Sequence, residues 1–367
     1  MKFVIDDKIP FIKGVLEPFA EVVYLPGGKI SAADVSDADA LVVRTRTCCN
    51  EALLKGSSVR FVATATIGFD HIDTKYCEDN GVFWTNAAGC NAQSVAQYVA
   101  SALCLLRKRG VLDFEGKTIG VVGVGNVGRR VRMVAEALGM KVLLNDPPCE
   151  LAEGKGEFVS LDEICEKADV ITFHTPLSLS GEFKTFHLAD VSFYDRLKKC
   201  PVVINAARGE VLDSLATLAA IKDGKISAAV IDCWENEPDI NKDLLMNAAV
   251  ATPHVAGYSA DGKANATSMS VRALSRFFGL GIDDFKVADI PLPENVRLDL
   301  GRMDDKVAEA VLATYDIGLD DANLRADAGL FERLRGDYPL RREFDSFVVS
   351  EKNSALERLG FLVSENC

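Results

Sequence analysis

The chain has 367 residues, which is enough for two or three domains. Its composition, with 48% hydrophobic and 26% charged residues, is ordinary for a folded globular protein. The formal net charge of −13 argues against nucleic acid or an anionic membrane surface as a partner. An anionic substrate would therefore need a locally positive pocket.

The ten cysteines are scattered, and none falls in a C-x-x-C pair. This pattern predicts reduced thiols in a cytoplasmic protein, without a zinc or other metal site. The opening residues, MKFVIDDKIPF, are typical of a strand and not of a signal peptide, because no basic segment precedes a long apolar one. The longest apolar stretches are too short to span a bilayer, so no membrane partner is expected.

The first ninety residues predict an α/β unit. Short apolar runs alternate with polar or helical segments, which favours a parallel, flavodoxin-like sheet. The expected strands are 3–5, 21–24, 40–43, 61–64 and 82–84. Two loops that follow strands, residues 44–47 and 65–70, are candidate substrate walls, because ligands of open α/β sheets bind beyond the carboxyl ends of strands.

A glycine-rich stretch, residues 117–146, predicts a dinucleotide site. An apolar strand at 118–122 leads into Gly123, Gly125 and Gly128, spaced as G-x-G-x-x-G, and a helix is expected at 127–138. Gly123 permits a tight turn, Gly125 lets a pyrophosphate approach the backbone, and Gly128 allows the helix to pack closely on the strand. The first N–H groups of that helix would face the phosphates.

Asp146 ends the next expected strand, 18 residues beyond Gly128. A carboxylate at this distance is typical of the residue that binds the adenosine ribose hydroxyls. It would repel a 2′-phosphate, and Pro147, Pro148 and Cys149 offer no cation to receive one. The sequence therefore favours NAD over NADP as the cofactor.

The elements around this motif predict a Rossmann-like second domain and a smaller third one. A helix at 91–108 would enter the second domain, and a helix at 258–280 would return to the first, with a cleft between them. Further strands are expected at 170–173, 202–206, 228–231 and 249–251, with helices at 161–167 and 215–221. The expected domains are residues 1–92 with 257–284, residues 93–256, and a small α+β domain at 285–367.

Three ionisable residues follow strands of the second domain, namely Arg208, Glu237 and His254. Oxidation of a secondary alcohol by a nicotinamide needs a base for the hydroxyl proton, and histidine titrates near neutral pH. It also needs a cation for a substrate carboxylate, which the planar fork of arginine can bind. A carboxylate beside the histidine would raise its pKa and fix its tautomer.

The other three histidines are weaker candidates for the base. His71 is expected at a helix start, where a surface position is favoured. His174 ends a strand and could line the cofactor site. His187 lies in a loop without a charged partner nearby in sequence, whereas His254 is held on a stiff turn after Pro253.

Five segments resemble the D-isomer-specific 2-hydroxyacid dehydrogenases: NAAGCNAQSVAQYV, GVVGVGNVGRRV, NAARGEVLD, DCWENEP and TPHVAGYS. The resemblance covers about residues 1–280. It implies an NAD-dependent enzyme in which Arg208 binds the substrate carboxylate and Glu237 supports His254 as the acid/base. It further implies cofactor contacts at Asn126, Val127, Thr175, Asp232 and Gly257, and substrate contacts at Thr45, Thr66 and Tyr258.

A narrower resemblance extends over nearly the whole chain. VRTRT, TATIGFDHID and LRGDYPLRREF are similar to one branch of that family, which acts on a small phosphorylated hydroxy acid and forms homodimers. The branch implies that residues 1–92 with 257–284 bind the substrate as a lid, and that 285–367 is a dimerisation domain.

Two further expectations depend on these residues. The phosphate would need its own donors, for which Arg44 and Arg46 are the best candidates, on the same side of an extended loop. Apolar residues at 307 and 310–312 suggest a buried helical face in a segment too short to build a large core alone. The alternatives are another family member, such as a phosphoglycerate dehydrogenase, or an NAD-sensing binding protein on the same fold.

Overall fold

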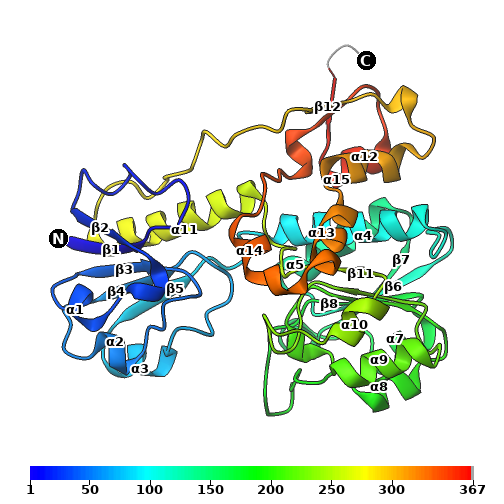
Figure 1. Cartoon of the computed structure of the whole chain (residues 1–367), viewed down its shortest axis with the longest axis horizontal. Helices are drawn as coiled ribbons and strands as arrows, with labels where there is room; N and C mark the ends of the chain where they lie inside the picture. Colours follow the sequence, from blue (N-terminus) through cyan, green and yellow to red (C-terminus); the bar gives the residue numbers. More distant parts are fainter. Residues whose placement is uncertain (365–367) are drawn as a thin grey trace. The chain divides into compact units, whose positions relative to one another are not determined.

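The computed structural model describes residues 1–364, and the chain divides into two compact units. The first unit is Met1–Asn91 with Ser259–Pro291, and the second is Ala92–Tyr258 with the chain from Leu292 onward. Figure 1 shows that each unit joins segments from distant parts of the sequence, since α11 (Ala260–Phe278) lies with the amino-terminal strands. In residues 1–364 no helix has both the length and the apolar character needed to cross a membrane.

The first unit is built on a five-stranded parallel sheet in the order β2-β1-β3-β4-β5. This is the flavodoxin-like order, as the alternating pattern predicts. Its strands are β1 (Lys2–Asp6), β2 (Glu21–Leu25), β3 (Ala40–Val43), β4 (Phe61–Thr64) and β5 (Phe83–Asn86). Its short helices are η1 (Gly27–Lys29), α1 (Ala32–Val35), α2 (Glu51–Leu54) and α3 (Thr74–Asp79).

Alternating side chains of these strands form two apolar cores, one on each face of the sheet. Phe3 and Ile5 of β1 pack with Leu274 of α11, and all three are fully buried. Val4, between them, lies in the other core with residues of α1, α2 and α3, such as Val35. Because helices cover both faces of the sheet, side chains on both faces are apolar, and the strands appear in the sequence as continuous apolar runs.

The second unit holds a six-stranded parallel sheet in the order β11-β10-β9-β8-β6-β7. Its strands are β6 (Thr118–Val122), β7 (Lys141–Asn145), β8 (Val170–Phe173), β9 (Val202–Asn205), β10 (Ala228–Ile231) and β11 (Val250–Ala251). A parallel bridge between Leu144 and Phe158 adds a one-residue strand beyond β7. With that bridge the order is the Rossmann one, in which the direction of winding changes between β6 and β8.

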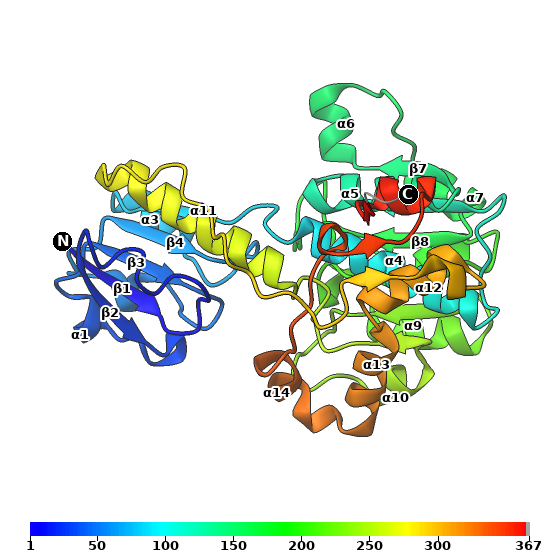
Figure 2. The ribbon, with the colours of Figure 1, turned by 90° about the horizontal axis from the view of Figure 1, so that it is seen from above.

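Helices cover both faces of this sheet (Figure 2). One face carries α4 (Ala92–Lys108) and α5 (Asn126–Ala137). The other carries a second core that includes residues of α7 (Leu161–Lys167), α8 (Val191–Arg196), α9 (Ser214–Lys222) and α10 (Lys242–Asn247). Two short helices, α6 (Pro147–Glu153) and η2 (Gly209–Val211), follow β7 and β9.

The carboxyl-terminal segment packs on α4 and α5 of the same chain. It contains a three-stranded parallel sheet, β12 (Arg297–Leu298), β13 (Val348–Val349) and β14 (Leu362–Val363). Its helices are η3 (Leu300–Arg302), α12 (Lys306–Thr314), α13 (Ile317–Ala326), η4 (Ala328–Leu330), α14 (Phe331–Gly336), η5 (Phe344–Ser346) and α15 (Ser354–Leu359). The expected mixture of helices and strands is therefore present.

The apolar face of α12 serves the chain itself. Ala310 and Val311 are fully buried, in one core with Leu103 and Leu106 of α4. The buried helical face expected at 307 and 310–312 is therefore present, and α4 of the same chain covers it.

Candidate active site

The glycine turn lies between β6 and α5, at the carboxyl end of the sheet. Gly123 has a φ of 90°, and a Cβ there would lie 2.7 Å from the carbonyl carbon of His174. A Cβ on Gly128 would lie 2.0 Å from the backbone oxygen of Gly123. Neither position has room for a side chain, because two backbone segments meet at each of them.

Gly125 differs from its neighbours, because a Cβ built there meets nothing within 4 Å. It precedes the first helical residues, Asn126 and Val127, whose N–H groups lie at the positive end of α5. No acidic residue stands in the first turn of α5. The turn therefore leaves open space beside unpaired N–H groups, which fits a pyrophosphate.

Two polar side chains next to this turn also fit a dinucleotide. The hydroxyl of Thr175 is buried and has no hydrogen-bond partner among the described residues. The carboxylate of Asp146 accepts the N–H of Val124 at 2.7 Å and that of Cys149 at 3.0 Å, so the glycine turn and α6 hold it in place. Each carboxylate oxygen keeps a further lone pair for a ligand hydroxyl.

His254 and Glu237 form a close pair, as the sequence leads us to expect. Nδ1 of His254 lies 2.8 Å from Oε2 and 3.0 Å from Oε1 of Glu237. The side chain of His254 is about one-third exposed, with a relative accessibility of 32%, whereas Glu237 is better covered. A ring that is anchored on one side and open on the other suits proton exchange with a ligand.

The surroundings keep this pair charged. Burial opposes protonation of His254, but Cys233 and Glu237 hold its pKa well above the ordinary value. Burial also raises the pKa of the Cys233 thiol, which leaves that group neutral, so Glu237 provides the charge. Burial works against ionisation of Glu237 too, yet His254 and the N–H of Trp234 lower its pKa overall.

The loop that carries Arg208 is joined to the loop that carries Glu237. A Cβ on Gly209 would lie 1.9 Å from the backbone oxygen of Trp234, so the two loops touch backbone to backbone. The amide of Asn205 donates to the carbonyls of Arg208, at 2.9 Å, and Cys233, at 3.2 Å. Arg208, Glu237 and His254 thus project from neighbouring loops at the same edge of the sheet.

Asp232 holds the loop that follows β11. Its carboxylate is buried and accepts the hydroxyl of Thr252 and the N–H groups of Val255 and Ala256 at 2.7, 2.8 and 2.9 Å. Burial raises the pKa of this carboxyl. Gly257 and Tyr258 continue directly from this loop, so the sequence positions expected near the nicotinamide are brought together here.

The other histidines have structural partners. His71, expected at the surface, is half-buried, and its Nε2 lies 2.9 Å from the hydroxyl of Thr64. Nε2 of His174 lies 2.9 Å from the hydroxyl of Thr172, and burial lowers the pKa of His174 to about 3, so the ring stays neutral.

His187 has charged partners, but they are not its neighbours in sequence. Nε2 of its ring lies 2.7 Å from Oε1 of Glu235, and Nδ1 lies 3.6 Å from Asp213. These carboxylates come from distant positions, so the residues next to His187 in the sequence do not indicate them.

The expected substrate contacts Thr45 and Thr66 lie in the first unit, beyond β3 and β4. Thr66 is bonded to the hydroxyl of Thr64 at 2.7 Å, and Thr45 is exposed. The extended loop expected for Arg44 and Arg46 is wrong: the N–H of Thr47 donates to the carbonyl of Arg44, which closes a turn. A four-residue turn does not keep alternate side chains on one side, as a strand would.

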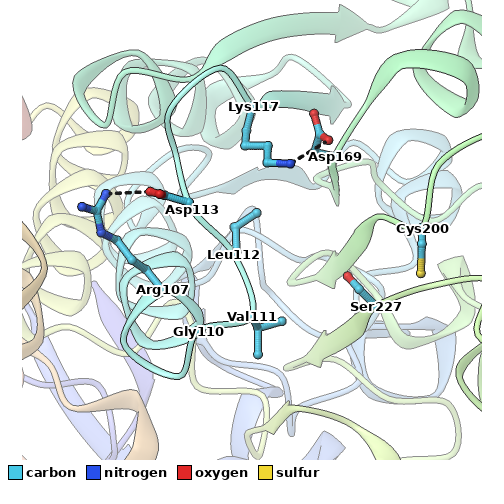
Figure 3. A pocket seen from close by; sticks show the side chains of 9 residues that line it. All are labelled: Arg107, Gly110, Val111, Leu112, Asp113, Lys117, Asp169, Cys200 and Ser227. Carbon is cyan, nitrogen blue, oxygen red and sulfur yellow. Dashed lines mark ion pairs between the residues drawn. The ribbon is translucent and has the colours of Figure 1, made fainter.

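One cavity, of about 570 Å³, opens at the opposite edge of the second sheet (Figure 3). Asp169 and Ser227 lie there, directly before β8 and β10, far in topology from the glycine turn. Its cations are neutralised, because Arg107 pairs with Asp113 and Lys117 with Asp169. We therefore assign no chemistry to this cavity, since ligands of such sheets bind at the carboxyl ends.

Arg335 of α14 is a site neighbour that the sequence did not reveal. Its guanidinium lies 5.9 Å from the ring centre of Tyr258, and its charge contributes to the lowered pKa of Glu237. The residue is more than 75 positions from Tyr258 and lies in the segment LRGDYPLRREF, to which the sequence assigned no role at the active site.

Comparisons with known proteins agree with this geometry. Residues 93–256 match the family described as D-isomer specific 2-hydroxyacid dehydrogenase, NAD binding domain, and residues 290–360 match a domain of unknown function, DUF3410. The chain is similar in fold to a D-lactate dehydrogenase from Aquifex aeolicus, with a TM-score of 0.63 and 24% identity over 78% of this chain and 97% of that one. It is equally similar to a 3-phosphoglycerate dehydrogenase from Entamoeba histolytica, with a TM-score of 0.65 and 24% identity over 79% and 99%.

Two relatives match over nearly their full length. The erythronate-4-phosphate dehydrogenase of Bacteroides fragilis is 52% identical over 350 residues, which cover 95% of this chain and 99% of that protein. The protein of the same name from Escherichia coli O157:H7 is 41% identical over 374 residues, with 98% of each chain covered. This chain therefore belongs to the erythronate-4-phosphate dehydrogenase family of the NAD-dependent D-isomer-specific 2-hydroxyacid dehydrogenases.

Proposed function

We propose that this protein oxidises 4-phospho-D-erythronate to (R)-3-hydroxy-2-oxo-4-phosphooxybutanoate with NAD, as a step of pyridoxal 5′-phosphate (vitamin B6) biosynthesis. The observation that carries the proposal is the His254–Glu237 pair beside a glycine turn that fits a dinucleotide. The similarity to relatives named erythronate-4-phosphate dehydrogenase supplies the substrate.

The residues divide the chemistry between them. When bound, NAD supplies the acceptor for the hydride that leaves C2 of the substrate. His254 takes the proton of the C2 hydroxyl at Nε2, because Nδ1 faces Glu237. Arg208 binds the C1 carboxylate with its fork of N–H donors and polarises the reacting carbon–oxygen bond. Both electrons of the C–H bond leave with the hydride, and the C2–O bond becomes a carbonyl.

The glycine turn and the loops beside it would bind the cofactor. Gly123, Gly125, Gly128, Asn126 and Val127 form the pyrophosphate site, and Asp146 binds the adenosine ribose. Thr175, Asp232 and Gly257 line the remaining path towards the nicotinamide.

The first unit would bind the substrate and close as a lid, with Thr45 and Thr66 as contacts together with Tyr258. The phosphate end would rest on Arg44 or Arg46, which follow β3 and are at least partly exposed. A cytoplasmic location is supported by nine cysteines within residues 1–364 that all carry free thiols.

We also propose a homodimer formed through residues 285–367. Leu292 and Leu340 are 61% and 47% exposed and line one cavity of about 400 Å³ in this segment. Exposed leucines at a cavity are typical of a surface that a partner covers. Sedimentation of the full chain at micromolar concentration tests this, and a monomer would contradict it.

The activity is tested with a panel of 2-hydroxy acids, each with and without a terminal phosphate. We expect NADH absorbance and a 2-oxo product with 4-phosphoerythronate, and much weaker turnover with erythronate and with 3-phosphoglycerate. The assay is repeated with a 2-oxo acid present, because a tightly held NADH would need reoxidation before a second turnover. A preference for 3-phosphoglycerate, or NAD binding without turnover on the panel, would contradict the proposal.

A further inference from the structure

The dipeptide Val255–Ala256, directly after His254, is held on both sides of its backbone. The carboxylate of Asp232 accepts both of its N–H groups, at 2.8 and 2.9 Å. The guanidinium of Arg341 donates to both of its carbonyls, with Nη1 on Val255 at 3.3 Å and Nη2 on Ala256. All four polar groups of these two residues therefore have charged partners.

Arg341 comes from the carboxyl-terminal segment, 87 positions after His254, and is 4% exposed. Its guanidinium also donates to the carbonyl of Ser94 at 3.3 Å and lies 4.3 Å from the ring centre of Tyr315. A buried cation is costly unless it is paired, and the carbonyls bonded to both Nη groups, together with the ring, offset that cost, although Nε has no hydrogen-bond partner among residues 1–364. They also fix its position, since a planar fork bonds well in few orientations.

The residues beside Arg341 are fastened to α4. The amide of Gln97 donates to the carbonyl of Arg342 at 2.9 Å, and the hydroxyl of Ser94 donates to the carboxylate of Glu343 at 2.8 Å. Arg341 is thus held between a rigid helix and the loop that carries His254. These contacts give a structural role to the run LRREF, residues 340–344, which is not part of the proposed NAD site.

His254 itself needs such support. It has a φ of 55°, in the left-handed region that side chains other than glycine rarely adopt. Its N–H donates to the carbonyl of Asp232 at 2.8 Å, but the carbonyls that follow it are bonded to Arg341. Without Arg341, the carbonyl of Ala256 loses its charged donor and that of Val255 keeps only the N–H of Tyr258, at 2.9 Å, both on the carboxyl side of a strained residue.

We propose that Arg341 is a positioning residue for His254, through which the carboxyl-terminal segment of the chain maintains the geometry of the active site. Arg341 is buried and acts by fixing Val255–Ala256 and, through them, the ring of His254 against Glu237. The inference rests on the proposed function in one respect, because turnover of the substrate is one of the two measurements that test it.

The test uses Arg341→Lys and Arg341→Met in the full chain, with Arg325→Lys as the matched control. Arg325 belongs to the same segment and also donates to two backbone carbonyls of the second unit, Leu245 at 2.6 Å and Ala248 at 2.7 Å. These carbonyls belong to α10 and its end, and not to the His254 loop. Arg325 also pairs with Asp321, which accepts the N–H of Ala251 in β11, and a lysine keeps the charge of that pair. The control therefore loses the same kind of bond while Asp321 still holds the strand that leads to the proposed base.

We expect the Arg341 variants to lower kcat by roughly 10- to 100-fold, because a displacement of about 1 Å can cost that much, while the KM for NAD changes by less than about twofold. Arg325→Lys is expected to lower the melting temperature but to leave kcat within about twofold. In a His254→Asn background, Arg341→Lys should produce no further loss of kcat, since it acts through the missing ring. Equal losses of kcat in the Arg341 and Arg325 variants, or a further loss in the His254→Asn background, would overturn the proposal.

A second readout does not depend on turnover. The chain has four histidines, so the ring signal of His254 can be assigned in an NMR spectrum by its loss in His254→Asn. In the Arg341 variants this signal should titrate at a lower pH than in the unmodified protein, because the ring is no longer held against Glu237. An unchanged titration would contradict the positioning role even if no substrate of the panel were turned over, which separates this inference from the proposed reaction.

Discussion

Nδ1 of His254 lies 2.8 Å from Oε2 of Glu237, and this contact decides which ring nitrogen exchanges a proton with the substrate. The pKa of Glu237 is lowered, so its carboxylate is ionised near neutral pH and can only accept. Nδ1 must then carry a hydrogen whether the ring is neutral or charged. Nε2 is left as the nitrogen that gains and loses the proton during the reaction.

Replacement of His254 by asparagine tests this assignment. Asparagine can still donate towards Glu237 but cannot take a proton, so kcat should fall by roughly 10²- to 10⁴-fold. NAD binding, followed by fluorescence titration, should stay close to that of the unmodified protein, because the glycine turn is untouched. Near-normal turnover in this variant would remove His254 from the mechanism.

The variant Glu237→Gln tests the electrostatic part of the pair. Glu237 raises the pKa of His254, so its neutral amide should let that pKa fall. Oxidation requires the neutral ring and increases as pH rises through this pKa, so the acidic limb of kcat/KM should move to lower pH. In the reverse direction the protonated ring is needed, and activity should be lost at a lower pH than before. A pH–rate profile that coincides with that of the unmodified protein would show that the two residues are not coupled.

Much of the fold could be predicted because local pattern and tertiary packing agree. The runs at 40–43, 61–64, 118–122 and 170–173 are apolar on both faces, and each is a strand with these bounds. The sequence pattern did not predict short helices whose start is set by a capping side chain and not by apolar periodicity. No helix is expected at 147–153, yet Pro147 and Pro148 begin α6, because the side chain of Asp146 caps this helix by accepting the N–H of Cys149.

Only those residues of the candidate site that lie in recognisable motifs could be predicted from the sequence. Arg208, Glu237 and His254 stand in short recognisable segments that follow strands, so topology alone places them at one edge. The partners of Arg341 and His187 could not be predicted, because 86 positions separate Arg341 from Val255 and 48 separate His187 from Glu235. Such contacts depend on how the carboxyl-terminal segment and long loops pack, which leaves no periodic trace in the sequence.

The three glycines of the turn should respond differently to alanine. Gly125 has open space around its Cβ position, so Gly125→Ala should leave the melting temperature nearly unchanged but raise the KM for NAD at least about tenfold, since the methyl occupies the pyrophosphate approach. In Gly128→Ala the new methyl meets the oxygen of Gly123, which should cost about 1–3 kcal/mol of stability. Thermal melts and cofactor titrations measure the two effects. A stable Gly128→Ala or a normally binding Gly125→Ala would contradict this division of roles.

Asp146 should control the choice between NAD and NADP. It also caps α6, so Asp146→Ser is the sharper variant, because serine keeps the cap while it removes the charge. The ratio of kcat/KM for NAD over NADP should fall by about tenfold or more, with stability changed by less than about 1 kcal/mol. If NADP were used as poorly as before, another residue would be excluding the 2′-phosphate.

The last prediction concerns the phosphate of the substrate. Arg44 follows β3, at the ligand-binding edge of the first sheet, and within residues 1–364 its side chain makes only one long hydrogen bond, of 3.2 Å, to the carbonyl of Lys8. A partly exposed guanidinium at this edge can turn to a phosphate and bind it with two donors. Arg60 offers a matched control in the same unit. It directly precedes β4, at the opposite edge, and pairs with Asp39 at 2.9 Å.

Arg44→Ala should therefore lower kcat/KM for 4-phosphoerythronate by roughly 10²-fold, which is the range of a lost charge-assisted bond. The much weaker kcat/KM for unphosphorylated erythronate should change by less than about threefold, because that substrate has no group for Arg44 to bind. Arg60→Ala should affect neither substrate selectively, since its surface ion pair contributes little. Steady-state assays of both variants on both substrates measure these ratios. Equal losses on the two substrates in Arg44→Ala would show that Arg44 supports the fold of the turn, and the phosphate would then have to be bound by Arg46 or by a residue outside this loop.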